Sequence, residues 1–149
     1  MDASKIQQVI LNLLLNANDA VPPGGNIRLL TFRSDLNRDG LPSPHVCCEV
    51  RDNGTGIAEK DLAHIFEPFF TTKAPGAGTG LGLSTSRGIL SQHGGTLEAE
   101  NRRGGGASFT FCLPQAPLNS SPAPRGTTAH PNTHRARPFP SQWPHFIGR

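Results

Sequence analysis

The sequence of 149 residues contains no apolar run near the length of a membrane span and no signal peptide. We therefore expect no membrane segment in this chain and a cytoplasmic location. The sequence also lacks any Gly-Lys pair, which excludes a P-loop. The dinucleotide-binding pattern G-x-G-x-x-G is missing as well, because Leu81 and Leu83 stand where its third glycine belongs.

Cysteine is scarce, with only Cys47, Cys48 and Cys112 present. Their number is odd, two of them are adjacent, and none has the spacing of a metal site. This pattern predicts buried thiols in a reducing cytoplasm.

Acidic residues are absent from 101–149, where six arginines give a charge of +6, whereas 1–100 holds eight basic and eleven acidic residues, or −3. The total of +3 is an average of two unlike segments, and we expect no nucleic-acid partner. Eight of the fourteen prolines fall in the last 36 residues, among few aliphatic side chains. We predict one domain over 1–114 and a disordered Pro/Arg/Ser-rich tail over 115–149. Alternatively, the tail is frame-shifted or read-through sequence.

Apolar residues recur every three or four positions between Met1 and Ala20, which predicts a helix. Because no cap or lead-in precedes the pattern, we expect the chain to be a piece of a longer protein. Asn12, Asn16 and Asp19 share a second face of this helix. That face is either solvated, or it presents amide oxygens to magnesium, which is usually shared with nucleotide phosphates.

Two strands are predicted next, over Ile27 to Phe32 and Val46 to Arg51, with a polar loop over 34–44 between them. Asp52 continues the apolar face of the second strand, where an unpaired carboxylate is costly. Either the following turn, 53–56, satisfies this carboxylate, or it accepts a hydrogen bond from a ligand amine.

A glycine-dense segment, 76–83, leads into a helix predicted over Gly82 to His93. This arrangement suits a phosphate, although glycine segments are also ordinary linkers. Lys73 stands at its entrance, where a cation can meet a terminal phosphate. A short helix over Ala58 to Ile65 is predicted before it.

A closing hairpin is predicted from Thr96 to Glu100 and from Ser108 to Leu113. The complete order predicts an α+β fold, a two-layer sandwich with the helices packed on one face of a mixed β-sheet.

Four segments in this order resemble the catalytic ATP-binding domain of bacterial sensor histidine kinases, nearest to the nitrogen-regulator-like subgroup. The same superfamily, called GHKL, holds the heat-shock chaperone, topoisomerase and mismatch-repair ATPases. The segments are the N box (Gln8 to Ala17), the first glycine box (Asp52 to Ile57), the F box (Ile65 to Lys73) and the second glycine box (Gly78 to Leu83). Together with the closing strand, Gly106 to Pro114, the resemblance covers about residues 2 to 114.

The resemblance implies ATP and Mg²⁺ as cofactors and a lid from Phe66 to Gly82. Asn16 is then the magnesium ligand, Asp52 accepts the adenine amine, and Lys73 lies near the terminal phosphate, so that Lys73 and Asn16 are the catalytic residues. The implied ATP-binding residues are Asn12, Asn16, Asp52, Gly54, Gly56, Ile57, Phe69, Thr71, Thr72, Lys73, Gly78, Thr79, Gly80, Leu81, Gly82, Leu83 and Ser108, the last through water.

Two family features are missing. None of the six histidines is followed by an acidic residue, as the phosphoacceptor histidine is in the family. The strand that precedes the N-box helix is absent too, which predicts an exposed sheet edge. The implied partner is therefore a separate dimerisation and phosphoacceptor domain, and indirectly a response regulator.

We expect the isolated chain to bind nucleotide without phosphorylating itself. An ATP-binding remnant or decoy without kinase activity is one alternative. A protein-serine kinase of the anti-sigma type is another alternative, and the F box argues against it.

Overall fold

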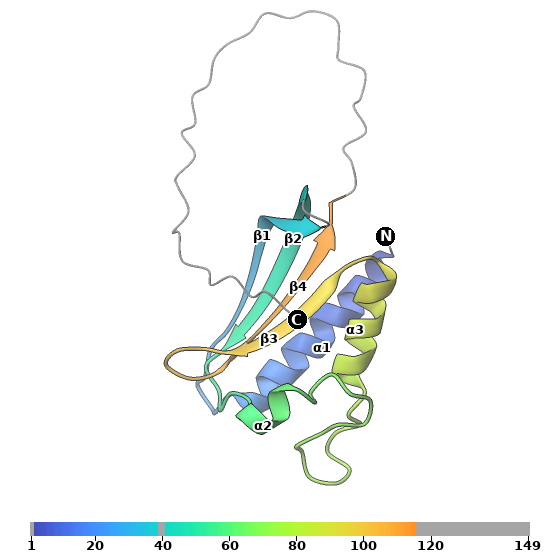
Figure 1. The fold of residues 1–149 in the computed structure, drawn as a ribbon. Helices are drawn as coiled ribbons and strands as arrows, with labels where there is room; N and C mark the ends of the chain where they lie inside the picture. The colour runs from blue at the N-terminus through green and yellow to red at the C-terminus, as the bar shows by residue number, and fades with distance from the viewer. Residues whose placement is uncertain (1, 39–40, 116–149) are drawn as a thin grey trace, which may run out of the picture. The chain divides into compact units, whose positions relative to one another are not determined.

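The computed structural model describes residues 2–38 and 41–115. Two helices, α1 (Ala3–Ala20) and α3 (Gly82–Gln92), lie beside each other on one face of a four-stranded sheet (Figure 1). The strands, in sheet order, are β1 (Ile27–Arg38), β2 (Leu41–Asp52), β4 (Ala107–Pro114) and β3 (Thr96–Asn101). One helical turn, α2 (Glu59–Leu62), precedes the loop into α3. The predicted α+β two-layer sandwich is confirmed.

The sheet differs from the prediction in one respect, because all three described strand pairs are antiparallel. The expected mixed sheet is therefore wrong for these strands. β1 with β2 and β3 with β4 are hairpins, whose strands must run in opposite directions, and β4 also runs against β2. β1 and β3 are the edge strands of the described sheet, and the edge that the sequence predicts to be exposed by a missing strand stays a prediction.

The α1 helix is capped by Asp2. One carboxylate oxygen of Asp2 accepts hydrogen bonds from the backbone N–H groups of Ser4 at 3.0 Å and Lys5 at 3.4 Å. A carboxylate in this position satisfies two of the N–H groups that have no partner within the helix. The expectation of an uncapped helix was wrong.

The core lies between the two helices and the inner face of the sheet. Side chains at helical spacing on α1 and α3 meet alternate side chains of β2, β3 and β4, which form the inner face of the sheet. The buried members of this core include Val9, Leu13, Ala17, Val50, Ile89, Leu90, Leu97, Phe109, Phe111 and Leu113. This packing fixes α1 against the strand end at which Asp52 lies.

The first hairpin is longer than the sequence predicts. β1 continues to Arg38 and β2 begins at Leu41, so most of the predicted loop 34–44 is paired strand. Apart from Leu36 and Leu41, the residues concerned are polar or proline, and their composition favours a loop. Cross-strand pairing in continuous register keeps them extended instead, as in the pair Asp35 and Pro44.

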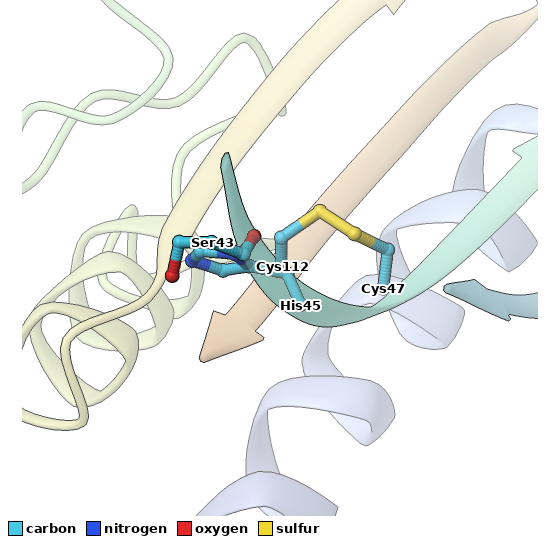
Figure 2. Close-up of a disulfide and its surroundings, with 4 residues drawn as sticks. All are labelled: Ser43, His45, Cys47 and Cys112. Carbon is cyan, nitrogen blue, oxygen red and sulfur yellow. A yellow bond between two sulfur atoms is a disulfide. The ribbon is translucent and has the colours of Figure 1, made fainter. Parts of the chain in front are cut away.

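A disulfide joins β2 to β4 (Figure 2). Cys47 and Cys112 are direct partners in the register of the two strands, and their sulfur atoms are bonded. The predicted buried thiols are therefore wrong for this pair and right for Cys48, which is free and buried. Neighbouring residues of a strand point to opposite faces, so only Cys47 of the adjacent pair can reach Cys112.

The predicted tail lies outside the described residues from position 116 onward. Among the described residues, no helix is both long enough and apolar enough to cross a bilayer.

Candidate nucleotide-binding site

A cavity of about 780 Å³ lies between α1, the lid (Phe66 to Gly82) and the inner face of the sheet. It brings together residues from all four predicted boxes, which are far apart in the sequence. Those of the predicted site that line it are Asn12, Asn16, Asp52, Gly56, Ile57, Thr71, Thr72, Lys73, Gly78, Thr79, Gly80, Gly82 and Leu83. Gly54, Phe69, Leu81 and Ser108 are not among the lining residues.

Asp52 is the buried carboxylate of this cavity, with only 2% of its surface exposed. Its Oδ1 accepts hydrogen bonds from the backbone N–H groups of Gly54 at 2.8 Å and Ala107 at 3.1 Å. The predicted turn therefore satisfies this oxygen. No hydrogen bond to Oδ2 occurs within the described chain, so a ligand donor can still bind the second oxygen of the carboxylate.

The backbone that follows Asp52 is held by the turn end of the closing hairpin. The Asn101 side chain accepts from the Ile57 N–H at 2.8 Å and donates to the Ile57 carbonyl at 2.6 Å. Arg102 donates to the Asp52 carbonyl at 2.8 Å. These three bonds tie the first glycine box to the end of β3.

Gly54 has a packing role. A Cβ at this position would lie 2.2 Å from the carbonyl oxygen of Ala20, the last residue of α1. The adjacent Thr55 N–H donates to the same carbonyl at 3.3 Å. Glycine is therefore required here so that the loop can close on the helix end.

On α1, Asn12 and Asn16 both face the cavity. The Nδ2 of Asn12 donates to the Gly82 carbonyl and to the Ser86 hydroxyl, each at 3.2 Å. Since both contacts use the amide nitrogen, the lone pairs of the Asn12 carbonyl oxygen remain available as acceptors. The Asn16 side chain makes no hydrogen bond within the described residues, so its oxygen is available to a ligand or a metal.

The lid folds back on itself at Phe69 and Gly80. The Phe69 N–H donates to the Gly80 carbonyl at 2.9 Å, and a Cβ on Gly80 would lie 2.4 Å from the carbonyl carbon of Phe69. Phe69 itself has φ 66° and is 75% exposed. Its ring therefore points away from the cavity, whereas Phe70 lines it.

Lys73 also lines the cavity, and its Nζ is bonded to the Asp19 carboxylate on the last turn of α1. This ion pair joins the lid to the helix that carries Asn16. The sequence places Lys73 and Asp19 in the right segments but gives no sign that they meet, because 54 residues separate them.

Ser108 requires a correction. Its hydroxyl donates to the buried carboxylate of Glu49, and it lines a separate hollow of about 320 Å³ with Arg51 and Arg103. Phe109 and Phe111 face the core, so Ser108 must face the opposite side of the sheet. The predicted role of Ser108 at adenine is wrong, and Ala107 occupies the cavity wall instead.

Glu49 forms a compact polar cluster on that opposite face. Arg51 donates to both of its oxygens, at 2.5 and 2.7 Å. Burial opposes the charged form of Glu49, but the hydrogen bonds from Arg51 and Ser108 outweigh burial, and the pKa of Glu49 is lowered. The cluster is thus a satisfied ion pair that braces β2 against β4.

Several lining residues were not predicted as part of the site: Leu15, Asp19, Ala20, Thr55, Ala58, Asp61, Ile65, Phe70, Ala107 and Phe109. Helical spacing offers a signal for some of them, because Leu15 and Asp19 follow the Asn12 and Asn16 face. The alternation of β4 offers another for Ala107. The described residues contain no cluster of three or more His, Cys, Asp or Glu that can hold a metal by itself.

The arrangement is that of a nucleotide-binding α+β domain with a buried carboxylate, a glycine-rich lid and an asparagine-bearing helix. Residues 1–117 match the family described as histidine kinase-, DNA gyrase B-, and HSP90-like ATPase. The chain belongs to this family, and it is a catalytic ATP-binding domain of the histidine-kinase type.

Three relatives illustrate the likeness. Sensor kinase CckA of Brucella abortus is 45% identical over 121 residues, which are 76% of this chain and 13% of that protein. The catalytic domain of histidine kinase ThkA has a TM-score of 0.62 and 38% identity, covering 76% of this chain and 68% of that one. Full-length ShkA in complex with AMPPNP has a TM-score of 0.60 and 30% identity, covering 74% and 21%. The chain thus spans a small part of its curated relative.

Proposed function

We propose that this domain binds Mg-ATP in the cavity and presents the γ-phosphate to a histidine on a separate dimerisation and phosphoacceptor domain of a sensor kinase. The buried Asp52 carries the proposal. Its Oδ1 is fixed by two backbone N–H groups, which aims the remaining oxygen at one ligand donor. The adenine amine is a donor of the required kind, and a buried anionic acceptor binds such a donor strongly.

Other residues that line the cavity suit the triphosphate. Asn16 offers a carbonyl oxygen, with Asn12 beside it, and oxygen is the ligand that Mg²⁺ prefers. Magnesium, when bound, neutralises charge on the phosphates. Gly78, Gly80 and Gly82 bring backbone close to the phosphates, and Lys73 supplies the cation of the lid. The AMPPNP complex of ShkA supports the same kind of ligand.

The chain's own residues bind and orient the nucleotide rather than supply a nucleophile. Phosphoryl transfer depends mainly on positioning and on charge stabilisation, so a domain of this kind needs no covalent chemistry of its own. The acceptor histidine comes from the partner domain, and a response regulator receives the phosphoryl group in turn. We place the reaction in the cytoplasm.

Titration of the full chain with labelled ATP, with and without Mg²⁺, examines the binding step. We expect saturable binding that Mg²⁺ strengthens. A phosphoacceptor domain from a histidine-kinase relative, added in trans, should then acquire an acid-labile phosphohistidine. Binding without any transfer would instead favour the decoy without kinase activity.

A further inference from the structure

Lys73 is held from two sides in the structure. Its Nζ is bonded to the Asp19 carboxylate on α1. On the lid side, its backbone N–H donates to the Thr71 hydroxyl at 3.2 Å, and a Cβ on Gly78 would lie 3.0 Å from the Lys73 Cδ. The lysine stem is therefore packed under the glycine segment, while its charged end reaches across to the helix.

The ion pair between Lys73 and Asp19 matters because of the other charges around the cavity. Lys73 is the one lysine or arginine among the described lining residues, which also include the carboxylates of Asp19, Asp52 and Asp61. The ion pair with Asp19 neutralises that single cation. A triphosphate that enters the cavity therefore meets no free cationic side chain unless Lys73 first leaves Asp19.

The pair is built so that it can be exchanged. The Asp19 side chain is 47% exposed and the Lys73 side chain 36% exposed. Water screens exposed pairs, and such pairs contribute little to stability. A phosphate group carries more negative charge than a carboxylate and can displace it from the ammonium group.

We propose that Asp19 is a positioning residue that holds Lys73 across the mouth of the nucleotide-free cavity. The phosphates of an incoming nucleoside triphosphate take Lys73 over from Asp19. The pair acts as a latch that makes affinity depend on the number of phosphates. This inference rests on the proposed nucleotide function, and it assigns to Asp19 a role that concerns the phosphates and not the base.

Equilibrium binding of ATP, ADP and adenosine to the full chain, in EDTA and again with Mg²⁺, measures the effect. Asp19→Asn should strengthen ATP binding in EDTA about threefold to tenfold and leave adenosine binding unchanged, since one competing carboxylate charge is removed. Asp19→Glu, which keeps the charge, should bind ATP as weakly as the wild type does. Asp61→Asn is the matched control, because it removes a cavity carboxylate that is not paired with Lys73.

A double-mutant cycle separates a latch from simple repulsion. In a Lys73→Met background, Asp19→Asn should bring no gain in ATP affinity, because no lysine remains to be released. An equal gain in both backgrounds, or an equal gain from Asp61→Asn, would mean that Asp19 only repels phosphate. No gain from Asp19→Asn in the wild-type background overturns the latch too.

Limited proteolysis follows the pair without any nucleotide. Trypsin cleaves after Lys73 only when the side chain is released, so Asp19→Asn should accelerate cleavage between Lys73 and Ala74, and Asp61→Asn should not. Unchanged cleavage contradicts the latch. Wild-type protein that binds neither ATP nor ADP contradicts the proposed function instead, while the cleavage rates still decide whether Asp19 holds the lysine.

Discussion

The Asn101 side chain forms two hydrogen bonds with the backbone of Ile57, one in each direction, and so fixes the first glycine box to the end of β3. Asn101→Ala removes both bonds. We expect the free energy of unfolding to fall by about 1–3 kcal/mol, since each bond contributes about 0.5–1.5 kcal/mol. ATP affinity should fall as well, because Ile57 lines the cavity. Chemical denaturation and nucleotide titration measure the two effects.

Asn18→Ala is the matched control for that experiment, because Asn18 is an exposed asparagine of α1 that does not line the cavity. It should leave nucleotide affinity unchanged. An Asn101→Ala protein with wild-type stability and wild-type affinity would show that the two bonds do not hold the loop in solution.

The disulfide between Cys47 and Cys112 should stabilise the sheet. It closes a segment of 65 residues, and cross-links of this kind contribute about 2–4 kcal/mol by restricting the unfolded chain. Reduction should therefore lower the free energy of unfolding by that amount in wild-type protein. A Cys47→Ser/Cys112→Ser double variant should have the lower stability already and should not respond to reductant.

Cys48 is not expected to replace either partner. Burial, with a contribution from the neighbouring Glu49 charge, raises the pKa of the Cys48 thiol. Little thiolate forms at neutral pH, and the thiolate is the reactive species. Mass spectrometry of the alkylated protein should find Cys48 unbonded, and a disulfide that includes Cys48 would contradict the observed register.

The Glu49 cluster predicts a pH dependence of stability. The pKa of Glu49 is lowered in the folded protein, so its contribution to stability is present above the pKa of the unfolded chain. That contribution is lost as the pH falls through the folded-state pKa. The difference in unfolding free energy between wild type and Glu49→Gln should therefore be largest at neutral pH and shrink over the acid range, as the pH falls below the ordinary pKa of a glutamate. A difference that stays constant over this range argues against the charged cluster.

Asn16→Ala examines the proposed metal ligand. Because Asn16 is expected to act through Mg²⁺, the variant should weaken Mg-ATP binding about tenfold and leave adenosine binding unchanged. The measurement is the ratio of ATP affinities with Mg²⁺ and with EDTA, with Asn18→Ala as the control. An equal loss of Mg-ATP and adenosine binding would indicate a role at the base or in folding.

Much of the architecture is readable from the sequence because its signals are local. The apolar spacing in α1 and the alternation in β4 indicate the face that each element turns to the core, and the glycine after α3 marks the end of that helix. The prediction of a loop over 34–44 was wrong because pairing with a neighbouring strand keeps these polar residues extended. No local sequence signal records that pairing.

The site also combines features that local sequence patterns predict with contacts that they do not. The orientation of Asp52 can be predicted from the sequence, because the two-residue period of β2 turns its carboxylate toward the core. The same alternation places Ser108 on the face of the sheet opposite the cavity. Counting two residues back from Phe109 identifies Ala107 as the residue in the cavity wall. The contacts of Asn101 with Ile57 and of Lys73 with Asp19 cross 44 and 54 residues, so only the folded chain brings them together.

Calorimetric titration of Mg-ATP into wild type and Asp52→Asn addresses the central claim most directly. The substitution keeps the size of the side chain and removes the charge of the buried acceptor, worth about 1.5–3 kcal/mol. We predict saturable binding to the wild type and an affinity roughly 10- to 100-fold lower in a folded Asp52→Asn protein. Equal affinities in the two folded proteins, or no nucleotide binding to the wild type, would contradict the account.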